Sequence, residues 1–211
     1  MGRVAVDPSD LNTQARIRNA ALEAFARRGI AGTSIRDVAR AADVSPGLVQ
    51  HYFPSKAALR EGVNDYVTAV VAGAFEQLPE LPTGAARADE LGRRITGIFR
   101  EHPLALLYGA RAVVEQDETA LGLFDTFVAL AEDQWTQAAA DGLLAPDVDV
   151  RWAALQIVLY NLAAILFEPA LDRHLTEPFL SDEGLDRWRR ASTRLFERGV
   201  FNPARLRRRR R

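Results

Sequence analysis

The sequence contains no cysteine and few residues that interrupt helices. Without a thiol, the 211-residue chain has no disulfide, no thiolate metal site and no cysteine nucleophile, which fits a reducing cytoplasm. Only ten prolines and fourteen glycines occur, and alanine, leucine and arginine dominate. This composition favours helix throughout the chain.

Long apolar runs are also missing. The longest nearly uncharged run, residues 152–167, has 16 residues, fewer than the ~20 that a membrane-spanning helix needs. The N-terminus carries no apolar stretch of signal-peptide length. We therefore expect a cytoplasmic protein without a membrane partner, in which this run forms a buried helix.

Motifs typical of enzymes are absent as well. There is no glycine-rich phosphate loop, no His-Glu-x-x-His pair and no nucleophile elbow. The three histidines, His51, His102 and His174, lie far apart without the spacing of metal ligands. We expect no catalytic residue, no metal and no cofactor, and an all-α enzyme is the remote alternative.

Charge is distributed unevenly along the chain. Residues 1–60 hold nine basic and five acidic residues, a net charge of +4, whereas residues 61–204 hold twelve basic and twenty-three acidic residues, a net charge of −11. A positive N-terminal part, here called the head, followed by an acidic part, the body, suggests that a polyanion binds the N-terminal part. Residues 205–211 add six arginines. This end is most simply a disordered, self-repelling tail, and nonspecific DNA affinity is its alternative role.

Apolar residues recur at helical spacing along the whole chain. The pattern predicts a first helix within residues 11–32 that stops at Gly29, and a second helix with Thr33 as its cap. The second to ninth helices are expected at about 33–40, 46–53, 56–78, 85–100, 104–115, 118–140, 149–168 and 183–198. No alternation of β-branched residues, Asn-Gly hairpin or internal repeat appears, so the fold class is all-α.

The third helix, which follows the capping residue Ser45, is too short to be stable alone. At about 100° per residue, Val49 and Phe53 share one face, and Gly47 and His51 lie on the opposite face. We expect the apolar pair to dock this helix on the first two helices. The polar and aromatic face then points outward, as in a helix-turn-helix that inserts its second helix into the major groove.

Residues 33–63, TSIRDVARAADVSPGLVQHYFPSKAALREGV, resemble the DNA-binding signature of TetR/AcrR-family transcriptional regulators. The matching features include the threonine-started helix, the small-residue turn with Val44, Ser45 before the short helix, and Ser55-Lys56 at the start of the next. The resemblance implies an N-terminal three-helix helix-turn-helix DNA-binding domain, residues 1–54. It also implies a C-terminal helical ligand-binding and dimerisation bundle, residues 55–204, before the basic tail.

The resemblance also implies roles for single residues. Thr33, Tyr52 and Lys56 match phosphate-contacting positions, and Arg36 matches a position that reaches a base in some members. The complete predicted DNA-binding set is Thr33, Arg36, Ser45, Gly47, Leu48, Gln50, His51, Tyr52 and Lys56. His51 as a solvated surface histidine, and Tyr52 as a core-edge residue, are the alternatives. For the head as a whole, the alternative is a helical hairpin that binds protein.

The chain departs from the family pattern at Gln50, where many members have tyrosine. This change removes a phosphate contact. It introduces an amide that can pair with adenine N6 and N7, so Gln50 is the first candidate for sequence readout, with Leu48 against a thymine methyl group.

Two amides, Gln156 and Asn161, interrupt the otherwise apolar run near residue 160. Burying an amide without a partner costs about 1 to 3 kcal/mol, so they are expected to meet a ligand, a partner subunit or a local acceptor. The candidate pocket residues are Tyr108, Phe124, Trp135, Gln156, Tyr160 and Asn161. Aromatic residues at helical spacing are usually core residues, which is the alternative for this set.

The family dimerises through its last two long helices, here residues 149–168 and 183–198. The candidate interface residues are Trp152, Leu155, Leu159, Leu166, Trp188, Leu195 and Phe196.

The resulting hypothesis is a homodimeric repressor that reads a palindromic operator in double-stranded DNA and is released by an unknown small-molecule effector. The acidic body could attract cationic compounds. A constitutive regulator of the same fold without an effector pocket is the alternative, and a cavity in the bundle would discriminate between them.

Overall fold

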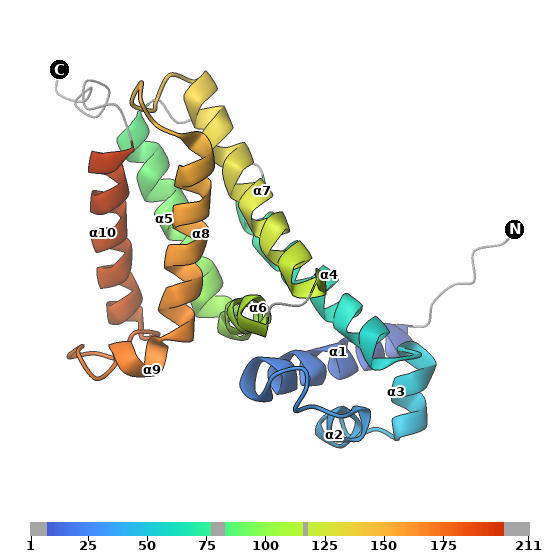
Figure 1. Cartoon of the computed structure of the whole chain (residues 1–211). Helices are drawn as coiled ribbons and strands as arrows, with labels where there is room; N and C mark the ends of the chain where they lie inside the picture. The colour runs from blue at the N-terminus through green and yellow to red at the C-terminus, as the bar shows by residue number, and fades with distance from the viewer. Residues whose placement is uncertain (1–7, 77–82, 116–117, 201–211) are drawn as a thin grey trace, which may run out of the picture.

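The computed structural model describes residues 8–76, 83–115 and 118–200, and its regular elements in these ranges are helices (Figure 1). The helices are α1 (Pro8–Arg28), α2 (Ile35–Ala41), α3 (Pro46–Tyr52), α4 (Lys56–Phe75), α5 (Gly84–Glu101), α6 (Pro103–Glu115), α7 (Glu118–Ala140), α8 (Val150–Leu166), α9 (Glu168–Leu171) and α10 (Asp182–Gly199). The all-α fold class is therefore confirmed. The arginine-rich tail lies outside the described residues.

Most helix boundaries lie within a few residues of the predicted ones. α4 ends at Phe75, before the expected end near residue 78. The single turn α9 was not predicted, because four residues carry no periodic pattern. In the described part of the chain, no helix combines the length and apolarity that crossing a bilayer requires.

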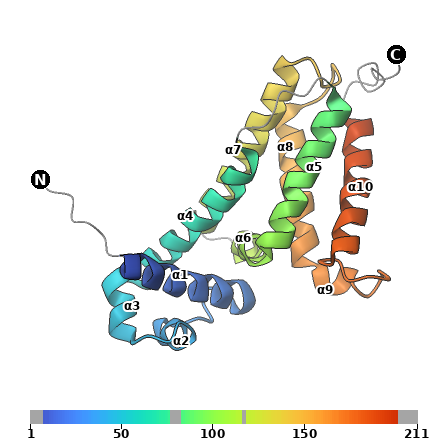
Figure 2. The same ribbon diagram turned by 180° about the vertical axis from the view of Figure 1, so that it is seen from behind.

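The helices form two groups that share α4. Figures 1 and 2 show α1, α2 and α3 together at one end, which we call the head, while α5, α7, α8 and α10 run side by side at the other end. We call α5 to α10 the bundle. α4 packs against α1 in the head and against α5 and α7 in the bundle, and α6 packs against α1. The predicted boundary at residues 54 and 55 thus falls just before a helix that belongs to both groups.

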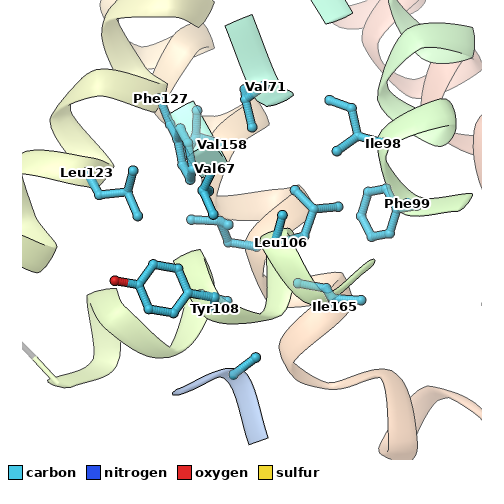
Figure 3. Close-up of a cluster of buried hydrophobic side chains, with 14 of the residues drawn as sticks. Val67, Val71, Ile98, Phe99, Leu106, Tyr108, Leu123, Phe127, Val158 and Ile165 are labelled. Carbon is cyan, nitrogen blue, oxygen red and sulfur yellow. The ribbon is translucent and has the colours of Figure 1, made fainter. Parts of the chain in front are cut away.

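The hydrophobic core continues from the head into the bundle. Figure 3 shows its central part, where every bundle helix except α9 and α10 contributes labelled side chains beside those of α4. The labelled side chains are Val67, Val71, Ile98, Phe99, Leu106, Tyr108, Leu123, Phe127, Val158 and Ile165. Burial of each large aliphatic side chain contributes about 1.5 to 3 kcal/mol, so packing rather than helix propensity holds the elements together.

Candidate nucleic-acid interface and bundle cavity

The helix α2 starts with a reciprocal cap between Ser34 and Asp37. The Ser34 hydroxyl accepts a hydrogen bond from the Asp37 backbone N–H (3.2 Å), and the Asp37 carboxylate accepts one from the Ser34 backbone N–H (3.0 Å). The Ser34 hydroxyl also donates to this carboxylate at 2.5 Å. These bonds favour the ionised form and hold the pKa of Asp37 below its usual value, and the bond from the Ser34 side chain is the largest cause.

Thr33, predicted as the cap of this helix and as a phosphate contact, lies inside the head. The residue is 2% exposed, and its hydroxyl donates to the carbonyl oxygens of Gly29 (2.9 Å) and Ala24 (3.3 Å). The cap prediction is wrong, and the hydroxyl is not available to a phosphate. A serine followed three residues later by a carboxylate, as in Ser34 and Asp37, is the sequence signal that would have identified the cap.

The turn between α2 and α3 is fixed by the head itself. The Val44 N–H donates to the Ala39 carbonyl (3.0 Å), and the Arg16 guanidinium of α1 donates to the Ala42 carbonyl (2.8 Å). Asp43 has a φ of 54°, a left-handed conformation that aspartate adopts more readily than most residues. These contacts set the angle at which α3 leaves α2.

α3 begins as the sequence predicts. The Ser45 hydroxyl accepts a hydrogen bond from the Leu48 N–H (3.1 Å), and Pro46 occupies the first helical position. Pro46 suits this position because the first N–H of a helix has no intrahelical partner.

The two faces of α3 are also as predicted. Val49 is 0% exposed and Phe53, which follows the helix, is 6% exposed, whereas Gly47 and His51 are exposed. This seven-residue helix is therefore held by its apolar side, and its polar side faces away from the molecule.

A glycine of α4 receives the edge of Phe53. A Cβ atom at Gly62 would lie 2.7 Å from Phe53 Cε1, so the ring occupies the space that a side chain would need. α3 also packs against α2. α2 is thus one of the two helices expected to support α3, and α4 is a support that the sequence pattern does not indicate.

The outward side of α3 carries further residues that are exposed or half-buried. Gln50 is exposed and Leu48 is 36% exposed. Tyr52 is half-buried and packs against the hydrophobic core, and its ring meets the His51 ring edge to face at a centroid distance of 5.3 Å. Tyr52 is therefore partly a core-edge residue.

Basic groups flank this surface. Lys56 is the first residue of α4, whose cap is the Ser55 hydroxyl, which accepts from the Ala58 N–H (3.0 Å). The N–H groups and the dipole of this helix start favour an anion next to the ammonium group. Arg36 of α2 is exposed, and exposed Arg40 pairs with Asp37 at 3.3 Å.

Three contacts link the head, the shared helix α4 and the bundle to one another. The Ile30 N–H donates to the Glu115 carboxylate at the end of α6 (3.2 Å), and the Arg18 guanidinium of α1 lies 4.0 Å above the Tyr66 ring of α4. The Tyr108 hydroxyl of α6 donates to Asn64 Oδ1 of α4 at 2.5 Å. Tyr108, a predicted pocket residue, is thus a buried residue of this junction.

The bundle holds a cavity of about 130 Å³. Its lining residues come from α4, α5, α6, α7, α8 and α10. Most lining side chains are aliphatic or aromatic, including Phe99, Phe127, Trp135 and Trp188. Trp135 and Asn161 are the predicted pocket residues found in the lining. The Asn161 amide donates to the Ile157 carbonyl at 2.7 Å, so a local acceptor satisfies it.

The remaining predicted pocket residues lie elsewhere. Gln156 is exposed, which removes the argument that its amide is buried, and half-buried Phe124 packs on the core. Tyr160 lies outside the lining, where its ring stacks on Trp188 at a centroid distance of 4.4 Å. Trp188 and Phe196, predicted for the dimer interface, line the cavity instead. The sequence shows that these faces of α8 and α10 are apolar but not which helix covers them.

Other members of the predicted dimer interface are at the surface. Trp152 (59% exposed) and Leu159 (49%) lie on one stripe of α8 together with exposed Gln156 and Ala163, because their spacings of four, three and four residues follow the helix turn. Leu195 of α10 is 61% exposed. Leu155 and Leu166 are half-buried.

No cluster of three or more metal-ligating side chains occurs among the residues that the structure describes. The exposed surface of the head and the cavity of the bundle are the two candidate sites that the sequence also predicts.

Comparisons with known proteins agree with this geometry. Residues 17–63 match the family described as bacterial regulatory proteins, tetR family. The chain is 30% identical over 145 residues to the HTH-type transcriptional regulatory protein RaaS of Mycobacterium tuberculosis, a match that covers 68% of this chain and 65% of RaaS. It is also 29% identical over 138 residues to the HTH-type transcriptional repressor KstR2 of Mycolicibacterium smegmatis. This match covers 60% of this chain and 64% of KstR2. The matches thus span less than two thirds of either relative.

A solved structure shows the same fold. A TetR transcriptional regulator from Chloroflexus aurantiacus superposes with a TM-score of 0.70 at 19% identity, over 92% of this chain and 99% of that one. The similarity therefore extends through both the head and the bundle.

Proposed function

Because the chain belongs to the tetR family of bacterial regulatory proteins, we propose that it regulates transcription as a homodimer that binds an operator and is released by a small molecule. The observation that carries this proposal is the geometry of α3, whose apolar face is buried while Gly47, Gln50 and His51 are exposed. A helix held in this way can enter the major groove of double-stranded DNA. Such a protein acts in the cytoplasm, where bacterial DNA is found.

The proposed division of labour at the DNA follows from chemistry. Lys56 and the start of α4 hold a phosphate, which contributes affinity but no sequence information. Gln50 and Leu48 read base edges, and the exposed residues Arg36, Ser45 and His51 add further contacts.

The exposed stripe of α8 that carries Trp152 and Leu159 supports the proposed dimer. One short helix contacts too few base pairs to be selective, whereas two heads spaced by about 34 Å read a palindrome. We propose that Trp152, Leu159 and Leu195 are covered by the same surface of a second chain.

The cavity supports the effector-responsive form over a constitutive regulator, because ordinary packing leaves few voids larger than a water molecule. Two helices connect this cavity to the head. Val71 of α4 and Leu106 of α6 line it, α4 begins at Lys56, and Glu115 at the end of α6 bonds to Ile30. A ligand that favours a shifted position of these helices changes the spacing of the heads and weakens operator binding by its differential affinity, typically about 1 to 3 kcal/mol.

The test separates phosphate contacts from base readout. Genomic fragments bound by the purified protein are selected, and affinities for the resulting operator and its single-base variants are measured by fluorescence anisotropy at several salt concentrations. We expect a steep salt dependence, and a slope that Lys56→Ala reduces by about 1 while weakening all sequences alike.

Gln50→Ala is expected to relax the preference at one base pair by about 1 to 3 kcal/mol. Gln137, an exposed glutamine of α7, provides the matched control, and Gln137→Ala should leave affinity and preference unchanged. Identical sequence preferences for the wild type and Gln50→Ala would remove the readout role of Gln50. Salt-independent binding would contradict the proposed electrostatic contacts.

A further inference from the structure

The wall of the cavity offers no unpaired charge. Among the described lining residues, the only ionisable side chain is Arg189 of α10. Its guanidinium Nη1 donates to the Asp89 carboxylate of α5 at 2.5 Å, and its Nε lies 3.8 Å from Asp186. An anionic ligand would have to displace one of these carboxylates, and a cationic ligand would find no carboxylate in the lining, so either would lose hydration without compensation.

Most polar groups of the wall are already satisfied. The side chains of Thr96, Asn161 and Ser192 donate to backbone carbonyls of their own helices, and the Gln134 side chain accepts a hydrogen bond from buried Arg87. These groups need no ligand.

Thr193 of α10 is different, because its Oγ1 is buried and has no hydrogen-bond partner among the described residues. The oxygen lies 2.7 Å from the position that a Cβ atom at Gly92 would take, so it faces a glycine of α5 that also lines the cavity. Rotation about χ1 exchanges the hydroxyl with the methyl group of this side chain and breaks no hydrogen bond. The hydroxyl is therefore free to turn toward a polar group in the cavity.

The size and surface of the cavity limit the rest of the ligand. A volume of about 130 Å³ is close to the ~150 Å³ of an apolar cavity that takes up benzene. Aromatic side chains on three helices, Phe99, Trp135 and Trp188, offer faces and edges against which a ring packs favourably.

We propose that the cavity binds an uncharged, mainly apolar molecule of about one ring that carries a single hydrogen-bonding group for Thr193. The inference rests on the proposed effector role and names the chemical class of the effector. It also departs from the expectation that the acidic body attracts cations, because the surface charge does not extend to the wall of the cavity.

Fluorine NMR of the full-length protein labelled with 5-fluorotryptophan tests this class without DNA. The chain has three tryptophans: Trp135 and Trp188 line the cavity, and Trp152 is exposed on α8. The probes are phenol, toluene, benzoate and benzylammonium, which share one ring and differ in charge and in one polar group. We expect phenol and toluene to shift the Trp135 and Trp188 resonances and to leave that of Trp152 in place, with phenol binding about three- to tenfold more tightly.

The variant Thr193→Val removes the hydroxyl and keeps nearly the same side-chain shape, so it tests the role of the hydroxyl alone. It removes an unpartnered buried hydroxyl, so the protein should remain folded with an unchanged or higher midpoint of unfolding. We expect it to reduce the affinity for phenol to that for toluene and to leave the affinity for toluene unchanged.

Several outcomes would overturn the inference: benzoate or benzylammonium binding as tightly as toluene, no shift of Trp135 and Trp188 with any probe, or equal affinity of wild type and Thr193→Val for phenol. A separate measurement of operator affinity with phenol present addresses the proposed function. If phenol occupies the cavity and operator affinity stays constant, the ligand class stands and the proposed effector role fails.

Discussion

At the scale of single residues, the Ser34 hydroxyl has two effects in the head. It caps α2, and it lowers the pKa of the Asp37 carboxyl to which it donates. Because the folded-state pKa is depressed, the contribution of this carboxylate to stability is present above its unfolded pKa and is lost as the pH falls through the lower folded value. Acid should therefore loosen the start of α2, next to the surface proposed to meet DNA.

The first prediction concerns this pair. In Ser34→Ala, the pKa of Asp37 should rise toward its ordinary value, since the largest cause of its depression is gone. The measurement is a carboxyl-carbon NMR titration through the acidic range. Ser55→Ala is the matched control, because Ser55 caps α4 in the same way but has alanine three residues later. An unchanged Asp37 titration in Ser34→Ala would show that the hydroxyl does not set this pKa.

At the scale of elements, α3 depends on close approach to its neighbours. Seven residues form too few hydrogen bonds to hold a helix in water, so the buried pair Val49 and Phe53 supplies its stability. The ring of Phe53 reaches α4 only because position 62 has no side chain. This contact joins α3, the helix proposed to enter the major groove, to the helix that continues into the bundle.

A second prediction follows for α4. Gly62→Ala places a methyl group 2.7 Å from Phe53 Cε1 and should lower the free energy of unfolding by about 1 to 3 kcal/mol, because the ring must shift. Gly73→Ala on the same helix meets no atom within 4 Å and should be neutral or stabilising by up to about 1 kcal/mol. Urea unfolding measures both variants. Equal stabilities would show that α3 and α4 are not in tight contact at this point.

At the scale of the whole molecule, α8 has two unlike sides. One side lines the cavity through Ile157, Val158 and Leu162, and the other exposes Trp152 and Leu159. Apolar side chains that form one exposed patch, unlike single exposed ones, are typical of an interface. The same helix therefore contributes to the proposed effector site and to the proposed dimer.

A third prediction tests the dimer. Leu159→Glu should yield a monomer at micromolar concentration in sedimentation velocity, because it places a charge in the centre of the apolar stripe. Affinity for a palindromic operator should fall by about 100-fold or more as the two heads lose their link. Val114→Glu is the control, since Val114 is 63% exposed on α6 and lies outside the stripe. A dimer that survives Leu159→Glu would contradict the assignment of this interface.

What the sequence determined is mainly local. The angular relation among neighbouring residues of a helix is set by its geometry, so the spacing of Val49, Phe53, Gly47 and His51 was enough to assign the two faces of α3. Caps also depend on adjacent residues, and Thr33 was misassigned only because two candidate hydroxyls stand next to each other.

Tertiary structure decided which distant surfaces meet. The apolar faces of α8 and α10 predicted that Trp188, Phe196 and Leu195 are covered, but periodicity does not say by what. Packing turned Trp188 and Phe196 to the cavity and left Leu195 at the surface. A cavity forms only where several helices pack without filling the space between them. The sequence of one helix therefore does not show whether its apolar face borders a cavity.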